Sequence, residues 1–223
     1  MKTTVVIKLN NINIKNEKKT DIIKDFSFSI KTGEKVAIFQ KNKAPIDKKI
    51  LPNLLIGKTE HSFGCMRLNG IIKSLSNIDD FFNLRMSGRK NIFNNELSLD
   101  IDKSNIEAME EEIIDFAETG MTIDNPVKIY SSIMKKKLAF AIGLHIPCNI
   151  LVVDHTFILN DGSFIEKCRD RIEMFAQNGG TFLLFDGSHE MAEKWCDRGV
   201  IIKNGNLIID DRIEKVLKLV NKI

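Results

Sequence analysis

The sequence predicts an α/β fold in which a mainly parallel sheet is wrapped by helices. In the second half of the chain, apolar runs of strand length alternate with amphipathic segments of helix length, which is the pattern of a parallel sheet with crossover helices. Two of these runs, residues 149–154 and 181–186, are almost wholly apolar up to a final aspartate. Strands that are buried on both faces of a sheet have this composition.

The amino-terminal part predicts antiparallel strands that lead into a central strand. The expected segments are strands at 5–9 and 22–30, a turn at 31–33 and a short buried strand at 35–39. A loop over residues 40–50 then leads to a helix that carries Leu51, Leu54 and Leu55. Pro52 fits the first turn of that helix, where a backbone N–H has no helical partner.

The middle of the chain gives a weak strand pattern and then two helices. Between residues 58 and 95 we expect short strands, punctuated by Gly64, Gly70 and Gly88. Residues 105–119 predict an amphipathic helix with acidic residues on its outer face, which Gly120 ends. The next helix begins after Ser131, a residue type that caps helices, and ends before Pro147.

The carboxyl-terminal part contains three further helices and a hairpin. The expected helices lie at 164–177, 190–196 and 212–222, and the hairpin joins strands at 199–203 and 206–210. Its turn, Asn204-Gly205, is typical of a two-residue hairpin. In open parallel sheets, ligands bind beyond the carboxyl ends of the strands. Asp154 and Asp186 each end a core strand, so we expect both at the ligand edge.

Composition and charge exclude several classes of protein. The 33 basic and 30 acidic residues give a net charge of +3, which does not indicate nucleic acid as a partner. Four scattered cysteines without a CxxC pair indicate neither a zinc site nor a disulfide framework, and a reducing cytosol fits them best. We expect neither a signal peptide nor a membrane-spanning segment. The lysines at 135–137 are expected on the outer face of their helix.

Three stretches then carry a specific resemblance: PVKIYSSIMKKKLAFAIGL, NILVVDHTFILNDGSFIEKC and WCDRGVIIKNGNL. They resemble the ATP-binding subunits of ABC transporters that export capsular polysaccharide, O-antigen and teichoic acid. GEKVAIF from Gly33 and SGRKNI from Ser87 fit the same alignment. The resemblance implies one nucleotide-binding-type domain over residues 1–223, with an antiparallel β subdomain and a helical subdomain at roughly 84–146.

In that family two subunits sandwich ATP, a strand-end aspartate holds Mg²⁺, and the next residue is a glutamate that activates water. The resemblance places Asp154 at the metal position and His155 at the general-base position. The glycine positions of the phosphate loop fall on Gln40, Lys43 and Pro45, where backbone N–H groups should approach the phosphates. Without gaps, the loop lysine aligns with Ile46. A two-residue insertion brings Lys48 to that position instead.

The remaining family positions are also altered. In the signature motif, Ser131 and Ser132 match the family, but Ile133 stands where a glycine lets the helix start approach the opposed subunit's phosphate. A capping role explains Ser131 equally well. The other equivalents are Asn83 for a γ-phosphate-sensing glutamine, Asp161 for the aspartate of the loop that crosses the dimer interface, and Gly187 for the switch histidine. His189 replaces that histidine only after a local shift.

We therefore interpret the chain as a degenerate, catalytically inactive ABC subunit associated with polysaccharide export, acting as an interaction or regulatory module. Loss of several hydrogen bonds to charged phosphates, each worth about 1.5–3 kcal/mol, predicts weak or absent binding of ATP and Mg²⁺. The expected partners are a second cassette, alike or different, and a membrane-spanning transporter subunit. The expected place is the cytoplasm, at the inner face of the membrane. Two alternatives stay open: ATP hydrolysis together with an intact partner, and reuse of the fold for another phosphorylated ligand.

Overall fold

The computed structural model describes residues 4–15, 21–41, 48–76, 78–97 and 103–222, and it contains two sheets. The antiparallel sheet has the order β2-β1-β4, and the six-stranded sheet has the order β5-β6-β7-β3-β8-β9. The strands are β1 Val5–Lys15, β2 Asp21–Lys31, β3 Lys35–Lys41, β4 Phe63–Leu68, β5 Ile72–Leu75, β6 Ile150–Val153, β7 Thr181–Phe185, β8 Arg198–Lys203 and β9 Asn206–Arg212. All neighbours in the larger sheet are parallel except β9, which pairs with β8 in the antiparallel sense.

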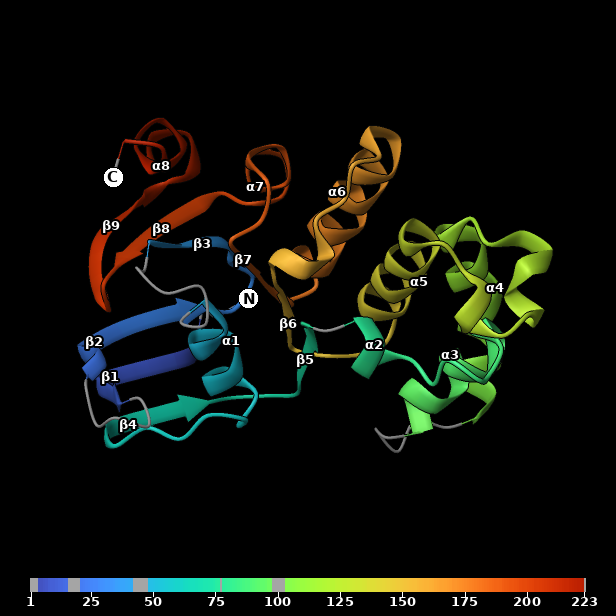
Figure 1. Ribbon diagram of the computed structural model, residues 1–223, viewed down its shortest axis with the longest axis horizontal. Coiled ribbons are helices and arrows are strands. Elements are labelled where there is room, and N and C mark those ends of the chain that lie inside the picture. Colours follow the sequence, from blue (N-terminus) through green and yellow to red (C-terminus); the bar gives the residue numbers. More distant parts are fainter. Residues whose placement is uncertain (1–3, 16–20, 42–47, 77, 98–102, 223) are drawn as a thin grey trace.

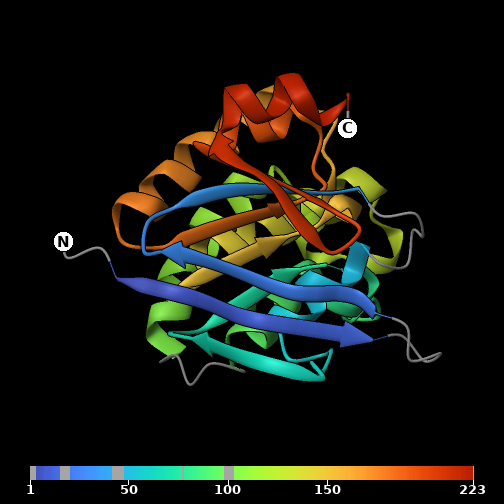
Figure 2. The same ribbon diagram turned by 90° about the vertical axis from the view of Figure 1, so that its left-hand side faces the viewer.

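The central strands of the larger sheet, β3, β6 and β7, are buried on both faces, and their successive side chains enter two different cores. In β7, Phe182 and Leu184 pack with the helices, whereas Leu183 and Phe185 pack against the antiparallel sheet and α1. Strands β3 and β6 divide their side chains in the same way. Since side chains alternate along a strand, a continuous apolar run supplies both cores at once. Figures 1 and 2 show the antiparallel strands on one side of this sheet and α5 to α8 on the other.

Helix α1 packs in the core shared with the antiparallel sheet, and the other helices form the outer layer and a lobe beyond β5 (Figure 1). They are α1 Ile50–Leu55, α2 Ile78–Phe81, α3 Gly88–Leu97, α4 Lys103–Ala117, α5 Ser132–His145, α6 Gly162–Gln177, α7 His189–Trp195 and α8 Ile213–Val220. Short 3₁₀ turns cover Gly120–Asp124, Val127–Ile129 and His155–Phe157. Among the described residues, no helix combines the length and the apolar character needed to cross a membrane.

Most of the predicted elements are confirmed. The hairpin turn is found at Asn204 and Gly205, whose φ values of 50° and 78° suit a two-residue turn. The parallel arrangement of the expected core strands is likewise found.

One part of the prediction was wrong. The glycine-punctuated segment between residues 58 and 95 gives strands only as far as β5, and Gly88 begins helix α3. A β-carbon at Gly88 would lie 2.5 Å from the Tyr130 hydroxyl oxygen. Close packing against Tyr130 therefore accounts for this glycine, which does not punctuate a strand.

Candidate functional site

The carboxyl ends of β6, β7 and β3 lie side by side and bring the two expected aspartates to one edge. These strands are neighbours in the sheet, with β7 in the middle. Asp154 follows β6 and Asp186 follows β7, while Gln40 lies near the end of β3. Lys48 and Lys49 precede α1 at the same edge, since Lys48 acts electrostatically on Asp186 and Lys49 on Asp154. The expected ligand edge is thus formed.

Asp154 is 1% exposed and satisfies only one of its oxygens. Its Oδ1 accepts hydrogen bonds from the Thr156 backbone nitrogen at 2.8 Å and from the Thr156 hydroxyl at 2.5 Å. Its Oδ2 is buried and has no hydrogen-bond partner among the described residues. Burial raises the pKa of Asp154 above its usual value, although the bonds from Thr156 and the nearby His155 and Lys49 oppose the rise.

Asp186 uses both of its oxygens, and both contacts come from Gln40. Oδ1 accepts the Gln40 backbone N–H at 2.8 Å, and Oδ2 accepts the Gln40 side-chain amide at 3.2 Å. The same Nε2 also donates to the Lys48 carbonyl oxygen at 2.6 Å. Burial raises the pKa of Asp186, with these bonds and the charge of Lys48 opposing it. The Asp186 carboxylate therefore joins the end of β7 to β3, and the Gln40 amide joins β3 to the residues before α1.

The structure describes only the two ends of the segment at which the resemblance predicts a phosphate loop. Lys43 and Pro45 lie outside the described residues. Gln40, at the first glycine position, is only 2% exposed and is held by the contacts to Asp186 and Lys48. The following helix α1 has only 6 residues and no side-chain cap at its start.

The signature residues begin helix α5 as expected, and Ser131 is its cap. The Ser131 hydroxyl accepts the Met134 backbone N–H at 3.2 Å, so the capping role is met within the chain. Ser132 and Ile133 line an open hollow of about 750 Å³ together with Lys136, Ile158 and residues 160–163. Ile133 is 37% exposed there. Its branched side chain thus lies on the surface where the family has only a glycine.

Asp161 is the cap of α6 and forms an ion pair with Lys137. Its Oδ1 accepts the Phe164 backbone N–H at 3.1 Å and the Ser163 hydroxyl at 2.7 Å, while Oδ2 lies 2.7 Å from Lys137 Nζ. The Lys137 ammonium holds the pKa of Asp161 far below its usual range. Placing residues 135–137 on the outer face was wrong for Lys137, whose side chain is 13% exposed and also pairs with Glu118.

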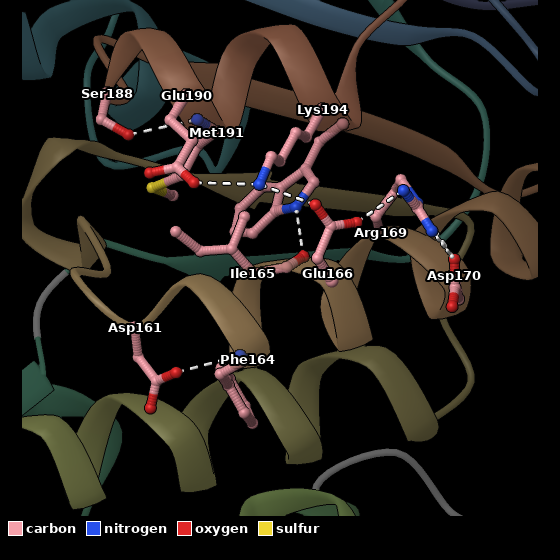
Figure 3. Close-up of polar contacts among 11 residues, drawn as sticks. Asp161, Phe164, Ile165, Glu166, Arg169, Asp170, Ser188, Glu190, Met191 and Lys194 are labelled. Carbon is pink, nitrogen blue, oxygen red and sulfur yellow. Dashed lines mark hydrogen bonds and ion pairs between the residues drawn. The ribbon is translucent and has the colours of Figure 1, made fainter.

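Helices α6 and α7 are joined by a hydrogen bond and by an ion pair of Lys194 (Figure 3). The Trp195 ring nitrogen donates to the Ile165 carbonyl oxygen at 2.9 Å. Lys194 lies between Glu166 and Glu190, at 2.6 and 3.0 Å. Ser188 caps α7 by accepting the Met191 backbone N–H at 3.2 Å (Figure 3). These contacts fix where α7 begins, three residues after Asp186.

Four further residues were singled out by the sequence, namely Asn83, Gly187, His189 and His155. Asn83 is exposed, and its side-chain oxygen accepts the Arg85 backbone N–H at 3.1 Å. Gly187 precedes the cap of α7, and a β-carbon there would lie 2.6 Å from the side chain of Leu184. His189 begins α7 and is exposed. His155 is half-buried in the 3₁₀ turn that follows β6, close enough to act on both strand-end aspartates.

The described residues of this edge offer one carboxylate oxygen that lacks a hydrogen-bond partner among them. The open Oδ2 of Asp154 is the kind of oxygen that Mg²⁺ takes as a ligand. Within the described part of the chain, no three histidine, cysteine or acidic side chains could hold a metal together. Gln40 already donates within the chain, so it offers no free amide to a phosphate. The described residues therefore provide one metal ligand and no built phosphate cradle.

Sequence comparison relates the chain to proteins of polysaccharide export. An O-antigen export system ATP-binding protein, RfbB of Klebsiella pneumoniae, is 32% identical over 197 residues, which cover 88% of this chain and 79% of that protein. The teichoic acids export ATP-binding protein TagH of Lactococcus lactis is 32% identical over 205 residues, or 92% of this chain. The match spans only 43% of that TagH protein. No family model matches the sequence.

Comparison of structures gives the same fold. CbiO1 of Clostridium perfringens, part of an ABC transporter complex, matches with a TM-score of 0.76 at 17% identity, covering 96% of this chain and 91% of that one. The ATP-binding subunit of another ABC transporter matches with a TM-score of 0.83 at 15% identity, covering 97% and 93%. The two sheets and their helical layer are thus those of an ABC ATPase cassette.

Proposed function

Because the chain belongs to the family of ABC transporter ATP-binding proteins that export O-antigen and teichoic acid, we propose that it is a cassette subunit of a polysaccharide exporter that does not itself hydrolyse ATP. It acts by pairing with a second cassette and with a membrane-spanning subunit, at the cytoplasmic face of the membrane. Its contribution is an interaction surface that regulates or completes the assembly.

The observation that carries this proposal is the place of Ile133. Its side chain is exposed in the first turn of α5 and lines the open hollow beside Asp161. In the family this helix start approaches the phosphate held by the opposed subunit. Backbone N–H groups at a helix start attract an anion only at close range. A branched side chain between the helix and the anion should keep them apart.

Two further substitutions lie in the half of the ATP site that this chain itself would supply, and they also argue against hydrolysis. His155 stands at the position of the general base, and Gly187 at that of the switch histidine. A base contributes only when the substrate is positioned against it. Neither the site of this chain nor the site that it completes on a partner then has a full set of groups.

Hydrolysis together with an intact partner is the second candidate. The observation that favours it is the open Oδ2 of Asp154, because this oxygen keeps the family's metal position available. This candidate requires Mg²⁺-dependent turnover that disappears in Asp154→Ala.

Steady-state phosphate release from Mg-ATP tests the proposal directly. The purified protein alone should show none above a no-enzyme blank, and a mixture with an intact cassette subunit of the same exporter class should release no more than that subunit does alone. Calorimetric titration with Mg-ATP should show weak or no binding. Turnover that Asp154→Ala abolishes would contradict the proposal and establish the second candidate.

Replacing Ile133 with glycine tests whether the Ile133 side chain blocks the approach of α5 to the phosphate. In a mixture with an intact cassette, Ile133→Gly should raise the partner's phosphate release if a composite site forms. Lys135→Gly is the matched control, because it places the same helix-weakening residue, which costs about 1 kcal/mol, elsewhere in the first turns of α5. Equal effects of the two variants would show that Ile133 does not block the site.

A further inference from the structure

Asp186 has an unusual backbone conformation. Its φ is 48°, in the left-handed region that few residues other than glycine, asparagine and aspartate adopt. Its backbone N–H continues the sheet by donating to the Ile38 carbonyl oxygen at 2.9 Å. The chain therefore turns sharply after β7, with both carboxylate oxygens bonded to Gln40 of the neighbouring strand β3.

The donors that meet this carboxylate are of the kind that meet a bound oxyanion. A backbone N–H and an amide N–H point at it from Gln40, and the ammonium group of Lys48 adds positive charge nearby. Bound phosphates use backbone N–H groups and a lysine in the same way. The Gln40 amide also donates to the Lys48 carbonyl oxygen, which ties together the two described ends of the loop.

The carboxylate of Asp154, which follows the neighbouring strand β6, makes no hydrogen bond to another strand among the described residues. Its contacts are to Thr156, two residues away, and its second oxygen remains open. The described sheet edge therefore carries one carboxylate with an unpartnered buried oxygen and one whose two oxygens are already engaged by donors. A phosphate entering at Gln40 and Lys48 would meet the negative charge of Asp186 and would have to displace its bonds.

We propose that Asp186 is a built-in anion that occupies the donors of Gln40, beside the positive charge of Lys48, and so excludes oxyanions of the phosphate class from this edge. Asp186 is thereby the residue that determines the ligand preference of the site. This inference rests on the proposed function, because it explains how a cassette fold is held without a nucleotide.

Neutralising the carboxylate is the direct test. Asp186→Asn keeps the shape and the left-handed backbone, which asparagine tolerates, and removes the charge. Tripolyphosphate without metal serves as the probe, with calorimetric titration at low and at physiological salt. Removal of a like charge a few ångströms from a bound anion should raise its affinity by about tenfold or more. Added salt should reduce the gain, because it screens charges at a partly exposed edge.

Two further variants separate charge from other effects. Gln40→Met removes the side-chain bonds to Asp186 and Lys48 but leaves the carboxylate, so it should gain less affinity than Asp186→Asn. Asp170→Asn removes an exposed carboxylate elsewhere, bonded to Arg169, and should change nothing. Circular dichroism melting checks that each variant is folded. If Asp186→Asn fails to fold, Asp186→Gly suits the same backbone and replaces it.

Tripolyphosphate affinity within twofold of the unaltered protein, in a folded Asp186→Asn or Asp186→Gly variant, would overturn the proposal. Tight binding of the probe by the unaltered protein would overturn it as well. Phosphate release from Mg-ATP by the unaltered protein is a separate result that contradicts the proposed function. The affinity comparison and the turnover assay therefore fail independently.

Discussion

Strands β6 and β7 are adjacent, and each ends in an aspartate, but the two carboxylates are held in different ways. Asp154 is fastened by Thr156 two residues away and leaves one buried oxygen open. Asp186 is fastened by Gln40, 146 residues away in the sequence, and leaves none open. The same sheet edge thus carries one carboxylate with an unpartnered oxygen among the described residues and one carboxylate whose oxygens are both bonded. Residue type alone does not decide what a strand-end carboxylate can bind.

The largest expected effect comes from truncating the buried side chain at the end of β7. Phe185 precedes Asp186 and is 1% exposed in the core below the antiparallel sheet. Phe185→Ala should lower the free energy of unfolding by about 3–5 kcal/mol, because it removes buried apolar surface and leaves a cavity. Urea unfolding measures this loss.

Phe63→Ala is the control for Phe185→Ala, since Phe63 is exposed at the edge strand β4. It should change the free energy of unfolding by about 0.5 kcal/mol or less. A small loss in Phe185→Ala would mean that the end of β7 is not anchored by this core, and the comparison with β6 would then need another cause.

The next largest effect is a pH dependence of the free energy of unfolding that comes from Asp154. The pKa of Asp154 is raised in the folded protein, so its ionised form destabilises the fold above that pKa. This penalty decreases as the pH falls through the raised pKa toward about 3.9, the ordinary value in the unfolded chain. Asp154→Asn removes the buried charge and should stabilise the protein at neutral pH by about 1–3 kcal/mol.

Urea titrations at several pH values measure this prediction. The advantage of Asp154→Asn over the unaltered protein should shrink as the pH is lowered. An advantage that stays constant with pH, or a variant that is less stable at neutral pH, would show that the open oxygen is not an unfavourable charge. Asp170→Asn, at an exposed aspartate of α6, should show no such pH dependence.

The sequence was a good guide where contacts are local. Ser131 could be recognised as a helix cap and Asn204-Gly205 as a hairpin turn, because neighbouring residues determine both features. The strand-end position of Asp154 followed from the apolar run before it. The metal, base and phosphate roles of these residues remain predictions, since geometry without a ligand does not test them.

Features that depend on distant partners could not be predicted. The contact between Gln40 and Asp186 follows from the order of strands in the sheet, which no single segment encodes. Helix α3 was missed because its face is mainly polar. Buried Asn91 fixes its start by donating to the carbonyl oxygens of Asn83 and Ser87, at 3.0 and 2.9 Å. Lys137 was misplaced for a similar reason, as its partner Asp161 lies on the next helix.

The smallest effect concerns the segment that follows Asp186. Ser188 caps α7 through the Met191 backbone N–H, and Ser188→Ala should lower the free energy of unfolding by about 1 kcal/mol. Ser188→Asn keeps a capping oxygen and should cost much less. If the cap also holds Asp186 in its left-handed turn, tripolyphosphate should bind Ser188→Ala more tightly than the asparagine variant. Equal affinity in these two variants would mean that Gln40 alone positions the carboxylate, which makes the long-range contact, and not the local cap, the difference between β7 and β6.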